Sequence, residues 1–262
     1  MSTPLRPAAA YLTRASITSS LKVELRRLTR SGLGLGVLVG FAFFGLSGPV
    51  LSIYMPEILG AAASTDQLAI SASQATPADA ISLFNQSAMQ LGLIVTVAVA
   101  ITSIGWDTRP GSSIFYRTRV HRLSTVLLPR LIIDWLIALA TYSCGLLLAV
   151  VVTASAIGHP PAGMVIRTWI ACGLYIVMAM SIGHLIAASL RRTTTAIALT
   201  TLLVLVLPVM NQVPGTSRWV PTALLLPTGL HAIPVIAALV VTGLCAVGSV
   251  LIARRQTLRR DA

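Results

Sequence analysis

Charged residues are scarce in this chain, and their scarcity excludes an ordinary water-soluble fold. Asp, Glu, Lys and Arg make up 10% of the 262 residues, against about 25% in a typical soluble domain. Hydrophobic residues account for 55%, and the mean hydropathy is +0.86. These proportions predict an integral membrane protein.

Lysine is almost absent, and this excludes a common nucleotide-binding site. The Walker A phosphate loop needs a lysine within the pattern GxxxxGK[ST], but the single lysine, Lys22, does not stand in such a run. The three cysteines, Cys144, Cys172 and Cys245, lie inside apolar stretches without CxxC or metal-ligand spacing. They predict neither a disulfide framework nor a metal site.

Six apolar runs have the length of membrane-spanning helices or approach it. A helix needs about 20 mostly apolar residues to cross roughly 30 Å of hydrocarbon. The first run follows a long basic segment and lacks a convincing cleavage site, so we expect it to be retained. The expected spans are 33–54, 88–104, 131–157, 169–190, 196–210 and 232–253. The sequence therefore predicts an all-α membrane protein with six spans.

The cations are distributed unequally between the two sides of this expected bundle. Of the 19 Lys and Arg residues, all except Arg167 and Arg218 fall on the side that holds both chain ends. Because Lys and Arg are enriched in cytoplasmic loops, we expect a multi-pass protein of the plasma (inner) membrane with both termini in the cytoplasm. The net charge of +12 is then explained by membrane anchoring, and no nucleic-acid partner is expected.

The segment before the first span has the pattern of an amphipathic helix. Four aliphatic residues at spacings of four, four and three share one helical face: Ile17, Leu21, Leu25 and Leu28. Four cations lie largely off that face: Lys22, Arg26, Arg27 and Arg30. Such a helix lies in the plane of the membrane interface, with its cations near anionic headgroups. We therefore divide the chain into a cytoplasmic N-terminal segment, 1–31, and a six-helix membrane domain, 32–262.

Aromatic residues are mixed with cations between the second and third spans. Trp106, Phe115 and Tyr116 stand among several arginines on the expected cytoplasmic side. Aromatic residues and Arg are enriched at protein interfaces, and exposed apolar clusters on soluble surfaces mark interaction sites. The alternative is a solvated basic loop. We expect a surface that docks a partner protein.

Few groups within the spans could carry chemistry. Asp134 and His184 are the candidates for a proton relay. Asp134 follows Arg130 by four residues, so a structural pair on one helical face is expected instead, and His184 is expected to hydrogen-bond another helix. Residues 45–48 read GLSG, as around a rhomboid-protease serine, but small residues that allow close helix packing explain the motif better.

At this point the chain resembles the permease subunits of type-2 ATP-binding-cassette (ABC) exporters, which move drugs, polysaccharides and lipids. Residues 22–31, KVELRRLTRS, resemble the elbow helix of that family, which often reads E-L-x-x-L-x-R. Asp107 followed by Gly111 and Ser112 resembles the acidic-x-x-x-G-[ST] start of its coupling helix, with Asp for the usual Glu.

Two further segments carry the resemblance. Arg122 and Arg130 stand where members often have Pro-x-x-Arg and a Lys eight residues later, although no proline precedes Arg122 here. The proline-rich residues 221–227 resemble the outer element between the last two spans of the family. The resemblance spans nearly the whole chain, and its strength lies in the order of the six spans, the elbow helix and the coupling loop.

The resemblance implies that this chain is not itself an enzyme. It implies two cytoplasmic ATPase subunits, which bind ATP and Mg, and a second permease, identical or paralogous; this chain would bind no cofactor and no metal. It also implies a coupling helix near 107–123, an N-terminal elbow helix and a short re-entrant outer segment near 213–230. The residues implied to dock the ATPase are Asp107, Arg109, Ser112, Phe115, Tyr116, Arg117, Arg119 and Arg122. Those implied for the elbow helix are Glu24, Arg26, Arg27 and Arg30.

The cargo is expected to be amphipathic and largely hydrophobic, such as a drug, an antibiotic or a lipid. The spans offer mainly apolar and small side chains, whereas a path for polyanions or ions would need several charges facing a wet interior. By resemblance, the second and fifth spans line the cavity, and their candidate residues are Gln90, Thr96, Thr102, Thr200, Thr201 and Asn211. Export by alternating access is the expected mechanism. The alternatives are an ion-coupled secondary carrier and a non-transporting assembly or immunity protein.

Overall fold

The computed structural model describes residues 19, 21–27, 30–62, 75–104, 124–190, 192–212, 219–226 and 230–258. In these residues the secondary structure is entirely helical. The elements are α2 (Leu33–Ala62), α4 (Pro77–Ser87), the π-helix η1 (Ala88–Gly92), α5 (Leu93–Ile104), α7 (Ser124–Ala156), α8 (Ala162–Ser189), α9 (Thr193–Val206), the 3-10 helices η3 (Leu207–Gln212) and η4 (Pro221–Leu225), and α10 (Ala232–Leu258).

Six helical stretches within these residues are long and apolar enough to cross a membrane. They are Leu33–Met55, Pro77–Ser103, Leu127–Ala156, Ala162–Ser189, Thr193–Gln212 and Ala232–Ile252. The prediction of an all-α protein with six membrane-spanning helices is confirmed to this extent. The second stretch begins eleven residues before the start expected at residue 88, because α4 and η1 continue directly into α5.

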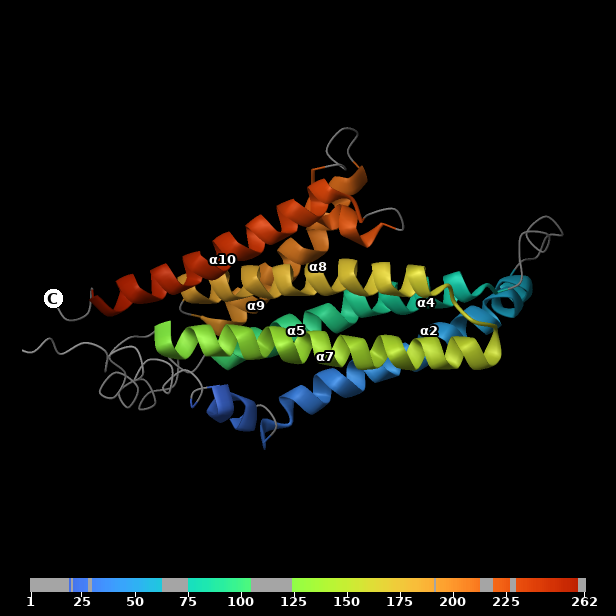
Figure 1. The fold of residues 1–262 in the computed structure, drawn as a ribbon, viewed down its shortest axis with the longest axis horizontal. Coiled ribbons are helices and arrows are strands. Elements are labelled where there is room, and N and C mark those ends of the chain that lie inside the picture. Colours follow the sequence, from blue (N-terminus) through green and yellow to red (C-terminus); the bar gives the residue numbers. More distant parts are fainter. Residues whose placement is uncertain are drawn as a thin grey trace, which may run out of the picture.

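The helices form an elongated bundle around α8 (Figure 1). Helix α8 packs against α5, α7, α9 and α10. In its most apolar stretch 67% of the residues are buried, against 17% in the corresponding stretches of the spans formed by α9 and α10. The N-terminal helical residues, drawn in dark blue, lie at the same end of the bundle as the C-terminal end of α10 (Figure 1). The last residues of α5 and the first residues of α7 lie there too. We call this end the foot of the bundle.

A short N-terminal helix, residues 21–27, precedes the bundle and is separate from α2. The chain between them passes through Gly32, whose φ of +70° lies in the left-handed region that favours glycine. A Cβ at Gly32 would meet no atom within 4 Å. The residues described just before α2, 30–32, are all exposed.

Glycines bring α2 and α7 into close contact. A Cβ on Gly45 would overlap the carbonyl oxygen of Gly145, and a Cβ on Gly145 would lie 2.6 Å from the carbonyl oxygen of Phe41. A Cβ on Gly48 would lie 2.8 Å from the Cα of Phe84 in α4. The expectation that the small residues at 45–48 allow close helix packing is confirmed.

An aromatic cluster fills the core beside this crossing. The Tyr142 ring stacks on Phe84 at a centroid distance of 5.9 Å and meets Phe41 edge-on at 5.8 Å. The Tyr142 hydroxyl donates to Asn85 Oδ1 at 2.9 Å, because a buried phenol needs a hydrogen-bond partner. This cluster ties α4 to α2 and α7.

The start of α4 is set by a local capping motif. The Thr76 hydroxyl accepts from the Asp79 N–H, the Asp79 carboxylate accepts from the Thr76 N–H, and Pro77 occupies the first turn. This capping box satisfies amides that a helix start leaves unpaired. The described residues between the expected first and second spans, which end at 54 and begin at 88, thus largely continue those spans, with α2 running to Ala62 and α4 starting at Pro77.

The fifth span ends in a tightened turn that holds a short outer element. Helix α9 passes into the 3-10 helix η3, where the Asn211 side-chain amide donates to the Thr222 carbonyl at 3.0 Å. The Thr222 hydroxyl donates to Asn211 Oδ1 at 2.8 Å. Residues 222–224 of η4 are buried against α8 and α10. The re-entrant segment expected near 213–230 is thus a single 3-10 turn in the residues described there.

Candidate functional site

A buried ion pair joins the N-terminal helix to the foot of α7. Glu24 Oε1 accepts from Arg130 Nε at 2.6 Å, and the side chains of the two residues are 8% and 1% exposed. Arg27 reaches the same carboxylate at 3.4 Å and also donates to the Ser103 carbonyl of α5 at 3.3 Å. Of the candidate elbow residues, Glu24 is therefore buried against the bundle, Arg27 reaches the bundle although its side chain is 41% exposed, and Arg26 and Arg30 are exposed.

A second polar cluster lies one helical turn further along α7. Asp134 Oδ2 lies 3.2 Å from His184 Nε2 of α8 and 2.8 Å from Ser103 Oγ of α5. All three residues are buried. The Ser103 hydroxyl also lies 2.7 Å from the carbonyl oxygen of Ala100, so its single proton can go to either acceptor.

The expected pairing of Asp134 with Arg130 is wrong. The four-residue spacing places both on one side of α7, but the described structure gives each a partner on another element, Glu24 for Arg130 and His184 for Asp134. A buried charge is stabilised best by a close partner with good geometry, and neighbouring helices supply one for each. The hydrogen bond expected between His184 and another helix is not formed in the described structure, because His184 Nε2 lies 3.2 Å from Asp134 Oδ2 but has no hydrogen-bond partner there.

Charges in the two clusters compensate one another. Two carboxylates, Glu24 and Asp134, face the guanidinium groups of Arg27 and Arg130 and the imidazole of His184. Ser103 contacts Asp134 rather than the imidazole, so these residues do not have the geometry of a serine nucleophile with its base. The described residues contain no group of three His, Cys, Asp or Glu side chains that could hold a metal ion. The clusters can hold helices in register.

The candidate ATPase-docking residues lie outside the described residues. All eight fall within the segment 105–123, between the end of α5 and the start of α7: Asp107, Arg109, Ser112, Phe115, Tyr116, Arg117, Arg119 and Arg122. The described structure shows the two ends of this segment, and both ends belong to helices that contact the N-terminal helix. Docking by these residues therefore stays a prediction.

Three of the six candidate cargo-path residues are engaged within the protein. Thr96 and Thr200 are buried and donate to backbone carbonyls one turn earlier in their own helices, Gly92 and Ala196, both at 2.7 Å. Asn211 pairs with Thr222. Hydroxyls that bond to their own helix are common in membrane proteins. These three side chains have structural partners that a cargo would have to displace.

The other three candidates each have a side-chain polar atom that can form a further hydrogen bond. Gln90 is exposed on the bundle surface, as is Thr102, whose hydroxyl donates to the Val99 carbonyl at 2.8 Å. Thr201 Oγ1 is buried and has no hydrogen-bond partner among the residues described. Helices α5 and α9 are in contact, so the second and fifth spans are neighbours. Within this set, Gln90 and Thr201 are the residues best able to bond a cargo.

A row of polar residues along the half of the second span that lies far from the foot extends this set. Ser82, Gln86 and Gln90 recur every four residues and are all exposed. Gln90 lies in the π-helix η1, where the Leu93 N–H donates to the Ala88 carbonyl five residues earlier. Single π-turns are frequent at functional sites. Sequence reasoning missed this turn, because the periodicity of side chains along a helix does not reveal one added residue.

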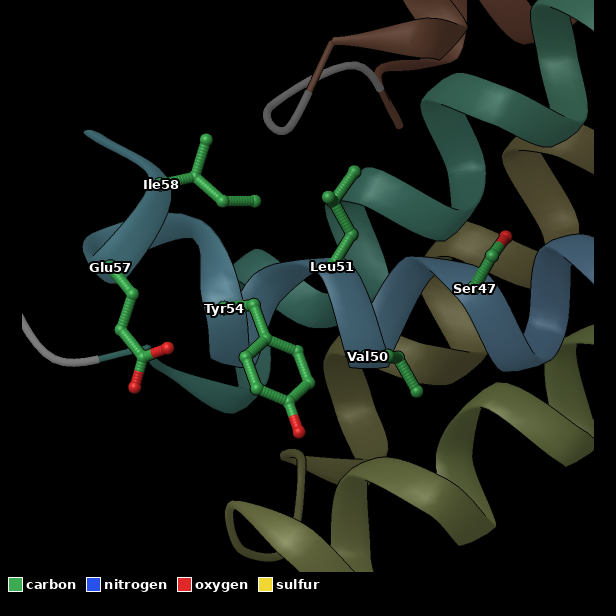
Figure 2. Close-up of a pocket in the computed structure, with 6 residues that line it drawn as sticks. All are labelled: Ser47, Val50, Leu51, Tyr54, Glu57 and Ile58. Carbon is green, nitrogen blue, oxygen red and sulfur yellow. The ribbon is translucent and has the colours of Figure 1, made fainter. Parts of the chain in front are cut away.

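A shallow groove lies at the outer end of α2. It encloses about 550 Å³ and is lined by Ser47, Val50, Leu51, Tyr54, Glu57 and Ile58. Figure 2 shows that all six side chains come from this one helix and that Tyr54 and Glu57 project from the same side of it. The lining is apolar with two polar groups at its outer end, as at a membrane interface.

Comparison with known proteins adds no family assignment. No protein-family model matches the sequence, and no curated protein is significantly similar to it. Function therefore has to be argued from the residues and their arrangement.

Proposed function

We propose that this chain is the membrane permease of an ATP-driven exporter of the type-2 ABC class. The observation that carries the proposal is the arrangement at the foot of a six-span bundle. There an N-terminal helix is packed against α7 and α5, beside both ends of the segment 105–123. In the proposal the foot faces the cytoplasm of a plasma (inner) membrane, and the 105–123 segment docks one of two ATPase subunits.

Sequence features support the same proposal. The distribution of Lys and Arg favours a cytoplasmic foot, and the 105–123 segment mixes aromatic residues with arginines as docking surfaces do. The chain lacks a Walker A lysine, so ATP hydrolysis would belong to a partner. A second permease, identical or paralogous, would complete the complex.

The docking role can be tested by replacing two residues of the segment together. Phe115→Ala with Arg119→Ala should weaken binding of the ATPase, since truncating one anchor of a hot spot costs about 2 kcal/mol or more. The measurement is co-purification of the ATPase with the tagged permease, followed by ATP-dependent transport in membrane vesicles. Arg260→Ala, at the far end of the chain, is the control. Unchanged co-purification and transport in the double variant would exclude this docking surface.

The proposed cargo is an amphipathic, largely hydrophobic compound that bonds to amide and hydroxyl groups along the second and fifth spans. Gln90→Leu and Thr201→Val should each weaken cargo binding by about 1 kcal/mol, roughly fivefold in affinity. Thr200→Val is the matched control, because the Thr200 hydroxyl already donates to the carbonyl of Ala196. The measurement is the concentration dependence of export for a panel of neutral and cationic hydrophobic compounds.

The cargo assignment has a clear contrary outcome. If Thr200→Val impairs export as much as Thr201→Val, the hydroxyl of Thr201 does not contact the cargo. If no hydrophobic compound is exported, while a charged polysaccharide precursor accumulates in cells that lack the transporter, the class of cargo is wrong and the exporter assignment stands.

An ion-coupled carrier is the second candidate, and the buried pair of Asp134 and His184 is the observation that favours it. Acid and imidazole groups within spans form proton relays in such carriers. Purified protein in liposomes, without an ATPase, separates the two candidates. Uptake driven by an imposed pH gradient would favour the carrier, whereas transport that requires ATP and a second subunit would favour the exporter. A protein that transports under neither condition would fit the assembly or immunity alternative.

A further inference from the structure

Glu24 occupies an unusual position in the N-terminal helix. It is the only acidic residue in the first 56 residues, and cations surround it in sequence. The helix turns this carboxylate toward the bundle, where it is buried, while its neighbours Val23 and Leu25 are 62% and 47% exposed. An amphipathic helix normally buries apolar side chains against protein and exposes charged ones. Here the acidic side chain provides the contact with the rest of the protein.

The contact reaches both α7 and α5. Arg130 of α7 binds the Glu24 carboxylate at 2.6 Å in a site that excludes solvent, and Arg27 donates to the Ser103 carbonyl of α5. Buried charge-assisted hydrogen bonds of this length are strong and geometrically specific. The N-terminal helix is therefore held by the two helices that flank the 105–123 segment.

The covalent connection of the same helix leads to α2 and is open. It passes through Gly32, which has a positive φ and no atom within 4 Å of a built Cβ, and Arg30 and Ser31 beside it are exposed. Glycine in the left-handed region can absorb a change of φ and ψ at little cost. The geometry thus combines a glycine of positive φ at the start of α2 with a specific bond to α7.

We propose that Glu24 and Arg130 are positioning residues that anchor the N-terminal helix to α7, so that the two move together. Because α5 and α7 carry the two ends of the 105–123 segment, a displacement of that segment is transmitted to the interfacial helix through this ion pair. The anchoring rests on the contacts above alone, whereas its part in coupling ATP hydrolysis to transport rests on the proposed function.

The anchoring is measured by the distance between spin labels in the full-length protein in lipid nanodiscs. The native cysteines are first replaced, and labels are placed at Val23, on the N-terminal helix, and at Leu128 of α7, which is 45% exposed. The distance distribution should be narrow in the parent protein and broad in Glu24→Gln and Arg130→Gln. It should be narrow again in the charge-swapped variant that combines Glu24→Arg with Arg130→Glu. Lys22→Gln, which changes an exposed cation of the same helix, should leave it narrow.

Three outcomes would overturn the anchoring. The first is a narrow Val23–Leu128 distribution in both single variants. The second is a charge swap that folds but leaves the distribution broad. The third is failure of both single variants to yield a monodisperse protein when the swap does so, because the pair would then be required for folding and not for positioning.

The coupling is measured separately as cargo transported per ATP hydrolysed, in the complex of permease and ATPase. Glu24→Gln should lower this ratio by about fivefold or more, the low end of typical coupling between distant sites, with unchanged ATPase co-purification. The charge swap should restore it. If Glu24→Gln keeps the parental ratio, the coupling role is wrong even where the anchoring holds. If the parent protein binds no ATPase and shows no ATP-dependent transport, the proposed function fails, and the spin-label result still decides the anchoring.

Discussion

Gly45→Ala should destabilise the bundle strongly, whereas Gly40→Ala in the same helix should be tolerated. A Cβ at Gly45 would overlap the carbonyl oxygen of Gly145 in α7, and backbone atoms cannot move aside without separating the helices. Overpacking of a well-packed core costs about 1–3 kcal/mol, and a backbone obstacle places this case at the upper end. A Cβ at Gly40 meets no atom within 4 Å, and Ala favours a helix over Gly by up to about 1 kcal/mol.

The measurement is the midpoint of thermal unfolding in detergent. Unfolding is monitored by the reaction of a thiol dye with Cys172 and Cys245, which are buried in the folded protein. The exposed Cys144 is first replaced, so that the signal comes from buried thiols alone. Gly145→Ala should resemble Gly45→Ala, because a Cβ there would lie 2.6 Å from the Phe41 carbonyl oxygen. Equal midpoints for Gly45→Ala and Gly40→Ala would show that α2 and α7 do not cross as closely as described.

Asp134→Ala should also destabilise the protein, by about 2 kcal/mol. The substitution removes the hydrogen bond from Ser103 Oγ to the carboxylate and the 3.2 Å contact of the carboxylate with His184, and a hydrogen bond to a charged group contributes about 1.5–3 kcal/mol. Asp134→Asn should cost less, because the amide oxygen of Asn can still accept one hydrogen bond. The same thermal unfolding measurement applies.

A double-mutant cycle with His184→Ala isolates the contact between the two side chains. If the pair interacts as described, the double variant should be less destabilised than the sum of the two single variants, because residues in contact are not additive. Additive losses would mean that Asp134 and His184 stabilise the bundle independently. In that case the pair of Asp134 and His184 would no longer support the alternative of an ion-coupled carrier.

The start of the second span could not be predicted from local hydropathy. Residues 77–87 include Asp79, Asn85 and Gln86, so an apolar window stops short of them. The structure nevertheless continues the helix there, since Ile81 and Phe84 are fully buried against neighbouring helices and a capping box starts the turn. Burial on one face stabilises a helix that its overall composition does not reveal.

The sequence by itself determined the class of protein, the number of spans and the side that carries the cations. Each of these features depends on single segments of about 20 residues. The backbone N–H and C=O groups of a segment in hydrocarbon must hydrogen-bond within that segment. Charged residues are excluded from the segment and gather in the loops beside it. Thr193–Gln212, the candidate fifth span, differs from the expected 196–210 by only two or three residues at each end. Local rules are sufficient for such features.

Only the tertiary structure decided which polar groups pair. Arg130 could have bound Asp134 one turn away, but Glu24, 106 residues earlier in the chain, holds it instead, and Asp134 turns to His184. Spacing within one helix indicates which side chains can come into contact. The most favourable partner of a buried charge, however, depends on which donors and acceptors the packing of several helices brings near it. That arrangement depends on how the helices cross, and the crossing of α2 and α7 depends in turn on glycines whose contacts lie about a hundred residues apart, as between Gly45 and Gly145.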